Sequence, residues 1–415
     1  MYQPNNNTVR QQVWSELHKL FGRFFEGTQG WNYSKQSRWR PVDVFQRIVQ
    51  AALENTSLED VCSSFEGCSA DTVQYRLNNL DFDYLVHQLN DMLRYITQGF
   101  HIHGRQKITL AIDITDFPWY GDRNHELSVG SKMQPGTIYF NRYFTACILT
   151  KTYRIPVYIR PIRQQDGVSP YILVEEMIRE IYWWCPFIRL LGDAWFFSKD
   201  LLDLLERYRI EFLFKKRIQF NLKREIEQIK TNQYRLAELA GVDSSNPKKM
   251  FRWLKQQKLI TFKFKSTLTM RNQRQYPVVV QTDFVKKKRN SKSEEQYIDW
   301  YAYTTNISAS GTYLKDLYKS RWGIETQYRV AHQFQAKTTS SSTAVRILTI
   351  GLSFVLTGIW LRINAFINRI SLKQKYTIDY DLPINIYASD VLKLTVSKLK
   401  RLIQTHWRVN YGGEK

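Results

Sequence analysis

Residues 317–332 read LYKSRWGIETQYRVAH and contain the spacing Tyr318-x2-Arg321-x3-Glu325-x6-His332. On an α-helix each residue turns by about 100°, so these four side chains would fall within roughly 60° of one another. The combination is too polar for a core face, and it mixes one acid with several proton donors. We expect a helical face that serves a metal ion and a phosphate group. The alternative is a solvated face with a chance ion pair.

Two aspartates earlier in the chain stand where short strands are predicted. In residues 107–114, KITLAIDI, apolar side chains alternate with others, so Asp113 would point away from the apolar face of a strand. A second apolar run, residues 188–191, ends just before Asp193, and Ser198 is placed to cap a following helix. Asp193 would therefore stand at the carboxyl end of a buried strand, where open α/β sheets bind ligands.

Three carboxylates, from Asp113, Asp193 and Glu325, can thus converge on a pair of divalent ions. Carboxylate oxygens are hard ligands, which suit Mg²⁺ or Mn²⁺. Asp116 is the alternative to Asp113, because it lies three residues further along the same strand.

The three blocks, in this order, resemble those of the DDE transposases of bacterial and archaeal insertion sequences, in the cut-and-paste group with a Tyr-Arg-Glu-Lys signature. The first block is residues 113–121 (DITDFPWYG), the second is residues 192–198 (GDAWFFS), and the third is residues 317–332. The resemblance covers about residues 105–370 of the chain. It implies an α/β fold with an RNase H-like core, in which helices flank a mixed sheet.

The activity that the resemblance implies is metal-dependent DNA cleavage and strand transfer. Asp113 would bridge two Mg²⁺ or Mn²⁺ ions, Asp193 and Glu325 would each hold one, and Tyr318 and Arg321 would position phosphates. The implied partners are double-stranded DNA, as transposon-end inverted repeats and as target, and a second copy of the chain in a homodimer. Excision through a hairpinned end is implied by the family alone.

His332 departs from the family pattern, which has lysine at this position. Lysine holds a phosphate as a permanent cation, whereas histidine titrates near neutrality. Arg329, one turn earlier on the same predicted face, could supply the missing charge.

The charge of the chain also favours a polyanionic partner. Its 415 residues suggest two or three domains, and 60 Lys+Arg against 38 Asp+Glu give a net charge of +22. Between Lys215 and Lys292 there are 21 Lys or Arg against 5 Asp or Glu, so most of the excess charge lies in this segment. Such a concentration is hard to explain by solubility.

The basic segment predicts a β-hairpin, because residues 260–265 alternate and residues 276–285 form another strand-like run. The resemblance implies a mostly β insertion here that grips the transposon end. The side chains expected on DNA phosphates are Lys286, Lys287, Lys288 and Arg289. Trp300, just after the basic segment, is either a core residue or a platform on which an unpaired base stacks.

The first hundred residues predict a helical DNA-binding domain. Residues 57–65 and 69–80, joined by a turn at Gly67, have the pattern of a helix-turn-helix. Its packing side chains would be Val61, Phe65, Val73 and Leu77. Those offered to DNA would be Thr72, Gln74, Tyr75 and Arg76. A plain helical bundle is the alternative.

Other features exclude several classes of protein. Four cysteines without paired spacing and seven scattered histidines indicate neither a zinc site nor a disulfide framework, so we expect a reducing cytoplasm. The apolar run 347–361 is shorter than the roughly 20 residues of a membrane span, so we expect a buried helix and no membrane partner. No signal peptide is visible. Residues 338–343 predict a linker that caps the next helix, and residues 388–407 an amphipathic helix.

We therefore predict five segments. They are a helical DNA-binding domain (1–104), the first part of the catalytic core (105–214), a basic β-rich insertion (215–306), the second part of the core (307–371) and a C-terminal helical region (372–415). Two other functions fit the same residues. One is a stand-alone metal-dependent nuclease, which would not join DNA ends. The other is a DNA-binding protein derived from a transposase, against which the three intact carboxylates count.

Overall fold

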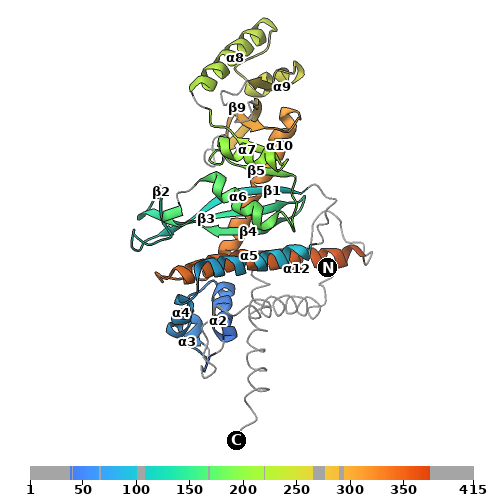
Figure 1. Ribbon diagram of the computed structural model, residues 1–415. Coiled ribbons are helices and arrows are strands. Elements are labelled where there is room, and N and C mark those ends of the chain that lie inside the picture. The colour runs from blue at the N-terminus through green and yellow to red at the C-terminus, as the bar shows by residue number, and fades with distance from the viewer. Residues whose placement is uncertain are drawn as a thin grey trace. The chain divides into compact units, whose positions relative to one another are not determined.

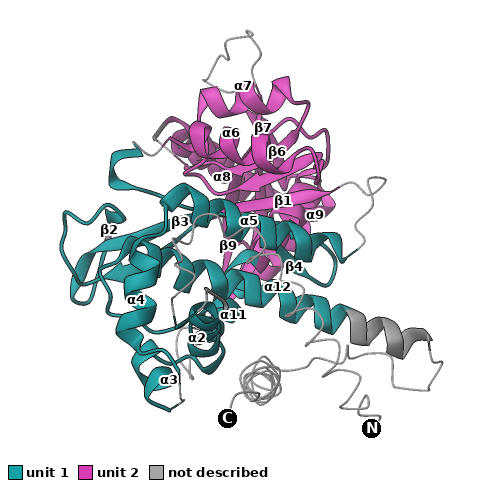
Figure 2. Cartoon of the chain, turned by 60° about the horizontal axis from the view of Figure 1, so that its bottom comes forward, with its two compact units in different colours: residues 1–106, 114–167, 324–415 teal, residues 107–113, 168–323 magenta. Residues whose placement is uncertain are grey.

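The computed structural model describes residues 38–39, 41–64, 67–100, 108–166, 169–218, 220–264, 276–288 and 294–373. The chain divides into two compact units (Figure 2). Unit 1 comprises residues 1–106, 114–167 and 324–415, and unit 2 comprises residues 107–113 and 168–323. The five-segment division has other boundaries and stays a prediction.

The strands of unit 2 form a mixed sheet in the order β1-β5-β6-β9-β8-β7. The pairs β1–β5 and β5–β6 are parallel, whereas β6–β9, β9–β8 and β8–β7 are antiparallel. The bounds are β1 (Thr109–Trp119, which continues into unit 1), β5 (Arg189–Gly192), β6 (Glu211–Lys215), β7 (Thr261–Phe264), β8 (Val278–Lys288) and β9 (Glu294–Thr305). Short buried runs such as Leu190–Leu191 are typical of parallel strands covered on both faces.

Helices flank this sheet, as expected. They are α6 (Pro170–Ile181), α7 (Lys199–Arg207), which packs on β6, and α10 (Gly311–Arg321), which contacts β5, β7 and β8. The helix after Asp193 begins as predicted, because the Ser198 side chain accepts a hydrogen bond from the Leu201 N–H. The mixed α/β character of the core is therefore confirmed (Figure 1).

The basic insertion is not mostly β, so that expectation is wrong for its first half. Two helices, α8 (Phe220–Leu239) and α9 (Pro247–Gln256), precede the strands. Buried residues recur at helical spacing, as in Met250 and Leu254, and Asn246 caps α9 by accepting from two backbone N–H groups. The predicted hairpin is confirmed, since β7 and β8 pair in antiparallel register.

In unit 1, the second part of β1 joins β2 (Ser128–Gln134) and β3 (Thr137–Leu149) in the order β2-β3-β1, and β4 (Arg154–Pro161) also pairs with β3. Two long helices, α5 (Phe82–Gln98) and α12 (Thr343–Lys373), pack against each other and against β4. Gly351 permits the close approach of the helices, because a Cβ there would overlap the Leu89 side chain.

Helix α12 is the predicted buried helix. Its stretch Thr343–Ala365 is long and apolar enough to cross a membrane, but 89% of its most apolar window is buried inside the protein. The preceding Ser/Thr-rich segment caps it as predicted, since the Ser342 hydroxyl accepts a hydrogen bond from the Val345 N–H.

The remaining helices of unit 1 are α2 (Pro41–Glu54), α3 (Leu58–Ser64) and α4 (Ala70–Asn78). Both helices of the predicted helix-turn-helix are present, and Val61, Val73 and Leu77 are buried between them and their neighbours. Phe65 and the predicted helix 388–407 lie outside the described residues.

Candidate active site

Two of the predicted ligands, Asp113 and Asp193, stand at equivalent places on neighbouring parallel strands. The register of β1 and β5 pairs Ala111 with Leu191, and the same offset two residues further reaches Asp113 and Asp193. Neighbouring strands lie about 4.8 Å apart, and side chains two residues apart point to the same face. Asp113 lies within β1 and Asp193 directly follows the end of β5, so the register brings the two residues to neighbouring backbone positions.

Helix α10 brings a cation to this pair of carboxylates. The Arg321 Nη1 lies 3.0 Å from the Asp113 Oδ2, and the two side chains are only 7% and 17% exposed. The Arg321 guanidinium is also 5.3 Å from the ring centroid of Tyr318, which in turn contacts the ring of Tyr303 at 5.2 Å. Four predicted site residues are thus gathered within unit 2.

The charges of both aspartates act on the hydroxyl of Tyr318. Burial raises the pKa of Tyr318, and the charges of Asp193 and Asp113 raise that pKa further against the opposing effect of Arg321. The tyrosine is therefore a neutral hydrogen-bond donor at any working pH. For Arg321, burial acts to lower the pKa, but Tyr318 and Asp113 outweigh it and the pKa is raised, so the guanidinium stays charged.

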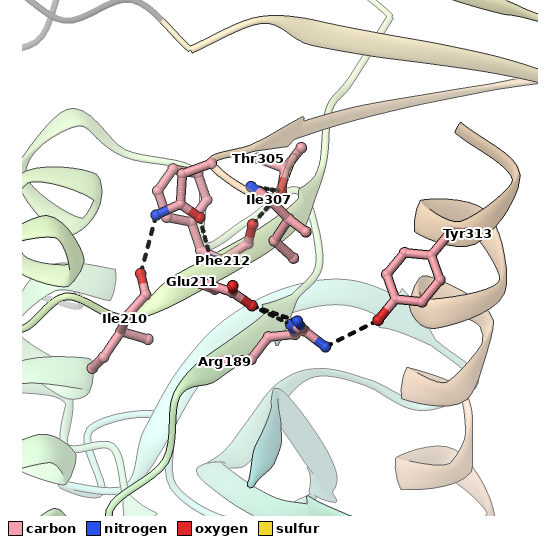
Figure 3. A network of polar contacts seen from close by, with 8 residues as sticks. Arg189, Ile210, Glu211, Phe212, Thr305, Ile307 and Tyr313 are labelled. Carbon is pink, nitrogen blue, oxygen red and sulfur yellow. Dashed lines mark hydrogen bonds and ion pairs between the residues drawn. The ribbon is translucent and has the colours of Figure 1, made fainter. Parts of the chain in front are cut away.

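Contacts that no sequence pattern predicts hold helix α10 in place. At its first turn, the Tyr313 hydroxyl accepts a hydrogen bond from Arg189 Nη1 at 3.3 Å, and Arg189 is ion-paired with Glu211 (Figure 3). Six residues before Arg321, the Lys315 Nζ lies 2.9 Å from the Asp283 Oδ2. These contacts hold the helix that carries Tyr318 and Arg321 against the sheet of unit 2.

The third block does not form one continuous helix, so the predicted single stripe is wrong. Helix α10 ends at Arg321, and α11 (Gly323–Ala331) begins after Trp322. The Trp322 N–H donates to the Lys319 carbonyl instead of the carbonyl four residues back, and the next residue, Gly323, is a weak helix former. The break also coincides with the boundary between the two units.

The later residues of the third block belong to unit 1 and are exposed. Glu325 lies in the first turn of α11, and Arg329 Nη2 donates to the Thr326 hydroxyl at 3.2 Å. His332 begins the 3-10 turn η3 (His332–Phe334), where its ring lies 5.1 Å from that of Phe117. These placements do not test the roles predicted for the three residues.

Asp116, the alternative ligand, is committed to a different contact. Its carboxylate accepts two hydrogen bonds from Arg142, at 2.8 and 3.1 Å, and a third from the Ser131 hydroxyl at 2.8 Å. Both oxygens of the Asp116 carboxylate are therefore already hydrogen-bonded.

The donor set of unit 2 fits a divalent ion in its chemistry. Asp113 and Asp193 offer hard carboxylate oxygens from adjacent strands, as Mg²⁺ and Mn²⁺ prefer. Within the described ranges, no group of three or more His, Cys, Asp or Glu residues is close enough to hold a metal ion. Asp113 and Asp193 are the two predicted ligands that belong to unit 2, and their role as metal ligands stays a prediction.

The predicted DNA contacts are spread over both units. Lys286, Lys287 and Lys288 lie on β8, with Lys286 exposed, whereas Arg289 lies outside the described residues. On α4, the Thr72 hydroxyl bonds with that of Ser69, Gln74 donates to Glu59 at 3.2 Å, and Arg76 is half-buried.

Trp300 has partners within unit 2. Its ring stacks on that of Phe262 at 5.9 Å, and the Lys230 ammonium lies 5.6 Å from its centroid. It packs against a small cluster of buried residues that includes Val280 and Ala302. These contacts favour the core interpretation of Trp300 over base stacking.

The sequence matches no protein-family model and no curated protein. Among solved structures, the chain is similar to the Drosophila P element transposase strand transfer complex, with 11% sequence identity and a TM-score of 0.25. The match covers 97% of this chain and 87% of that chain.

Proposed function

We propose that this chain is the transposase of an insertion sequence, which binds transposon ends and catalyses metal-dependent DNA cleavage and strand transfer. The observation that carries the proposal is the register of β1 and β5, which brings Asp113 and Asp193 to neighbouring positions, together with the ion pair of Arg321 with Asp113 and the contact of Arg321 with the ring of Tyr318. Two carboxylates beside a buried cation are what a site for divalent ions and phosphates requires.

In this proposal Asp113 and Asp193 hold Mg²⁺ or Mn²⁺, and Glu325 is a further ligand on the basis of the sequence pattern alone. Bound in a pair, such ions stabilise the attacking and the leaving oxygen of a phosphoryl transfer. Side chains of α10 would bind the phosphate of the DNA. Arg321 stays charged and offers a guanidinium to a phosphate, and Tyr318 stays protonated and offers a hydroxyl hydrogen.

Binding of the DNA ends is assigned to the basic insertion and to the helix-turn-helix. Between Lys215 and Lys292 the insertion holds 21 Lys or Arg against 5 Asp or Glu, which suits the phosphate backbone of a duplex. A homodimer that holds both ends belongs to the same proposal.

Joining a pre-cleaved end to a target tests the proposal. The full chain is incubated with Mg²⁺, a supercoiled plasmid, and a labelled duplex that carries the inverted repeat flanking its own gene and ends in a free 3′-hydroxyl. We expect label covalently attached to the plasmid, and no attachment with Asp193→Asn. Cleavage without attachment would identify a nuclease instead, and binding without either reaction would identify a DNA-binding protein.

A further inference from the structure

Helices α8 and α9 form a second helical hairpin, which lies in the basic insertion of unit 2 (Figure 1). Gly241 follows α8 with a φ of +69°, a left-handed conformation that glycine adopts without strain. The Gly241 N–H donates to the Glu238 carbonyl at 3.0 Å. The Val242 N–H donates to the Ala237 carbonyl at 2.9 Å, which completes a Schellman motif. This motif ends α8 and turns the chain towards α9.

The rest of the turn is held by side-chain hydrogen bonds. The Asp243 carboxylate accepts from the Ser245 N–H at 3.2 Å, and it lies 3.4 Å from the Lys249 ammonium on α9. The Asn246 side chain accepts from the first backbone N–H groups of α9. The start of α9 is therefore fixed by the turn before any ligand binds.

One face of α9 is bound to the rest of the insertion. Met250 and Leu254 are buried and cluster with Ala237 of α8. The Phe251 ring stacks at 6.4 Å on that of Phe284, which belongs to β8. The sheet and α8 thus cover this face and leave the opposite face of the helix uncovered.

The uncovered face of α9 is strongly basic. The sequence of the helix, PKKMFRWLKQ, contains four Lys or Arg and neither Asp nor Glu. At about 100° per residue, Arg252 lies at the centre of this face, Gln256 one turn further, and the other cations towards its edges. We call this surface the α9 outer face; its side chains, all exposed, are Lys248, Lys249, Arg252, Lys255 and Gln256.

The predicted recognition helix of unit 1, α4, offers far less to a polyanion. Its sequence, ADTVQYRLN, contains one arginine and one aspartate, so it carries no net charge. The Gln74 side chain is also engaged, because it donates to Glu59 at 3.2 Å. By charge and by the side chains left exposed, α9 is the better suited of the two helices to bind DNA.

We propose that α9 is a recognition helix that enters the major groove of duplex DNA, with Arg252 and Gln256 on base edges and Lys249 and Lys255 on the phosphates at either side. Arginine forms paired hydrogen bonds with guanine and glutamine with adenine, whereas lysine at the rim neutralises the backbone. The inference rests on the part of the proposed function that assigns DNA binding to the insertion. It adds that the insertion recognises base sequence through a helix, and does not only hold the backbone.

The test selects bound duplexes from a pool with a random central segment, with the full chain in EDTA so that no DNA is cut. We expect the wild type to enrich one sequence. Arg252→Lys keeps the charge but loses the paired hydrogen bonds, so the preference at one base pair should fall about tenfold while affinity for a scrambled duplex hardly changes. Gln256→Ala should relax the preference at a neighbouring base pair. Both side chains are exposed, and equal urea midpoints would show that the variants are folded.

The matched controls are Arg224→Lys, at an exposed arginine of α8, and Arg76→Lys on α4. Both should leave the preference at these base pairs unchanged. The proposal is overturned if the wild type enriches no sequence, or if Arg252→Lys and Gln256→Ala enrich the same sequence with the same preferences as the wild type. A loss of affinity that is equal for all sequences would overturn it too, because α9 would then contact only phosphates.

The same selection separates this inference from the proposed function. An enriched sequence that depends on Arg252 but is absent from the inverted repeats flanking the gene would contradict the transposase and support α9 as a sequence-specific helix. An enriched sequence that lies in those repeats but is unchanged in the α9 variants would do the reverse.

Discussion

Asp113 and Asp193 each lie two residues beyond a paired position, Ala111 on β1 and Leu191 on β5, in one parallel register. Asp113 lies within β1, whereas Asp193 directly follows the end of β5, where its carboxylate accepts a hydrogen bond from the Trp195 N–H. A pair of like charges on adjacent strands is unfavourable by itself, so a cation is required between or beside them. In the structure Arg321 supplies that cation to Asp113.

Removal of the Arg321 guanidinium should separate metal binding from catalysis. We expect Arg321→Ala to bind Mg²⁺ more tightly, because the arginine no longer competes for Asp113, and yet to cut DNA at least a hundredfold more slowly. Loss of the buried pair should also lower the free energy of unfolding by roughly 3 kcal/mol. Calorimetric Mg²⁺ titration, a cleavage assay and urea unfolding measure the three effects. Arg321→Lys keeps the charge, so its Mg²⁺ affinity and its cleavage rate should lie between those of the wild type and Arg321→Ala. An unchanged Mg²⁺ affinity in Arg321→Ala would show that the arginine does not compete with the ion for Asp113.

The contact between Asp283 and Lys315 should position helix α10. We expect Asp283→Asn to reduce the cleavage rate about tenfold and to leave DNA affinity nearly unchanged, because the side chain holds α10 and does not contact phosphate. The stability should drop by about 1–2 kcal/mol, since the pair is largely buried. Asp243→Asn is the matched control, as Asp243 pairs with Lys249 on the exposed surface of the same insertion. The positioning role is wrong if both variants cleave at the wild-type rate.

The basic insertion should give end binding a steep salt dependence. Each neutralised phosphate contributes about −0.9 to the slope of log K against log salt concentration. Replacement of Lys286, Lys287, Lys288 and Arg289 by glutamine should make the slope less negative by about 2 to 4 if these side chains contact the backbone. Fluorescence anisotropy between low and physiological salt provides the slope. An unaltered slope would place the DNA on another surface.

The cysteines should be slow to react in the folded chain. Burial, and next the nearby Cys68, raise the pKa of Cys62 to about 11, and burial raises that of Cys185 to about 12. Alkylation at pH 8 should therefore be far slower in buffer than in urea and should accelerate as the pH rises toward 11. The thiol pKa is higher in the folded chain than in the unfolded chain, so the contribution of each thiol to stability is fully present below the unfolded pKa. This contribution is lost as the pH rises from about 9 through 11, so urea midpoints should fall over that range. Fast labelling of Cys62 at pH 8 would contradict its burial.

The sequence predicted the local elements of the site well, because their signals are local. The apolar run before Asp193 corresponds to strand β5, and Ser198 is the N-cap of the next helix, α7. The alternation at residues 260–265 became a strand of the predicted hairpin. In each case a few neighbouring residues decide the structure, through side-chain alternation or a capping hydroxyl.

Contacts between residues far apart in the sequence could not be predicted from local patterns. The ion pair of Arg321 with Asp113 joins residues 208 positions apart, and nothing in the local pattern selects it over other pairs. The helix break at Trp322 was missed because a lone glycine within a helical pattern is usually tolerated. The two helices of the insertion were missed because the expectation of a mostly β insertion came from the family resemblance and not from residues 220–256.

The central claim is that Asp113 and Asp193 act together as metal ligands for DNA cleavage. The most direct measurement compares Mg²⁺-dependent cleavage of a transposon-end duplex by Asp113→Asn, Asp193→Asn and Asp116→Asn, with DNA affinity measured alongside. We predict that the first two variants bind the duplex as the wild type does but cut it at least a thousandfold more slowly, while Asp116→Asn, which loses only its pairing with Arg142, still cuts. Normal cleavage by either of the first two variants would contradict the account.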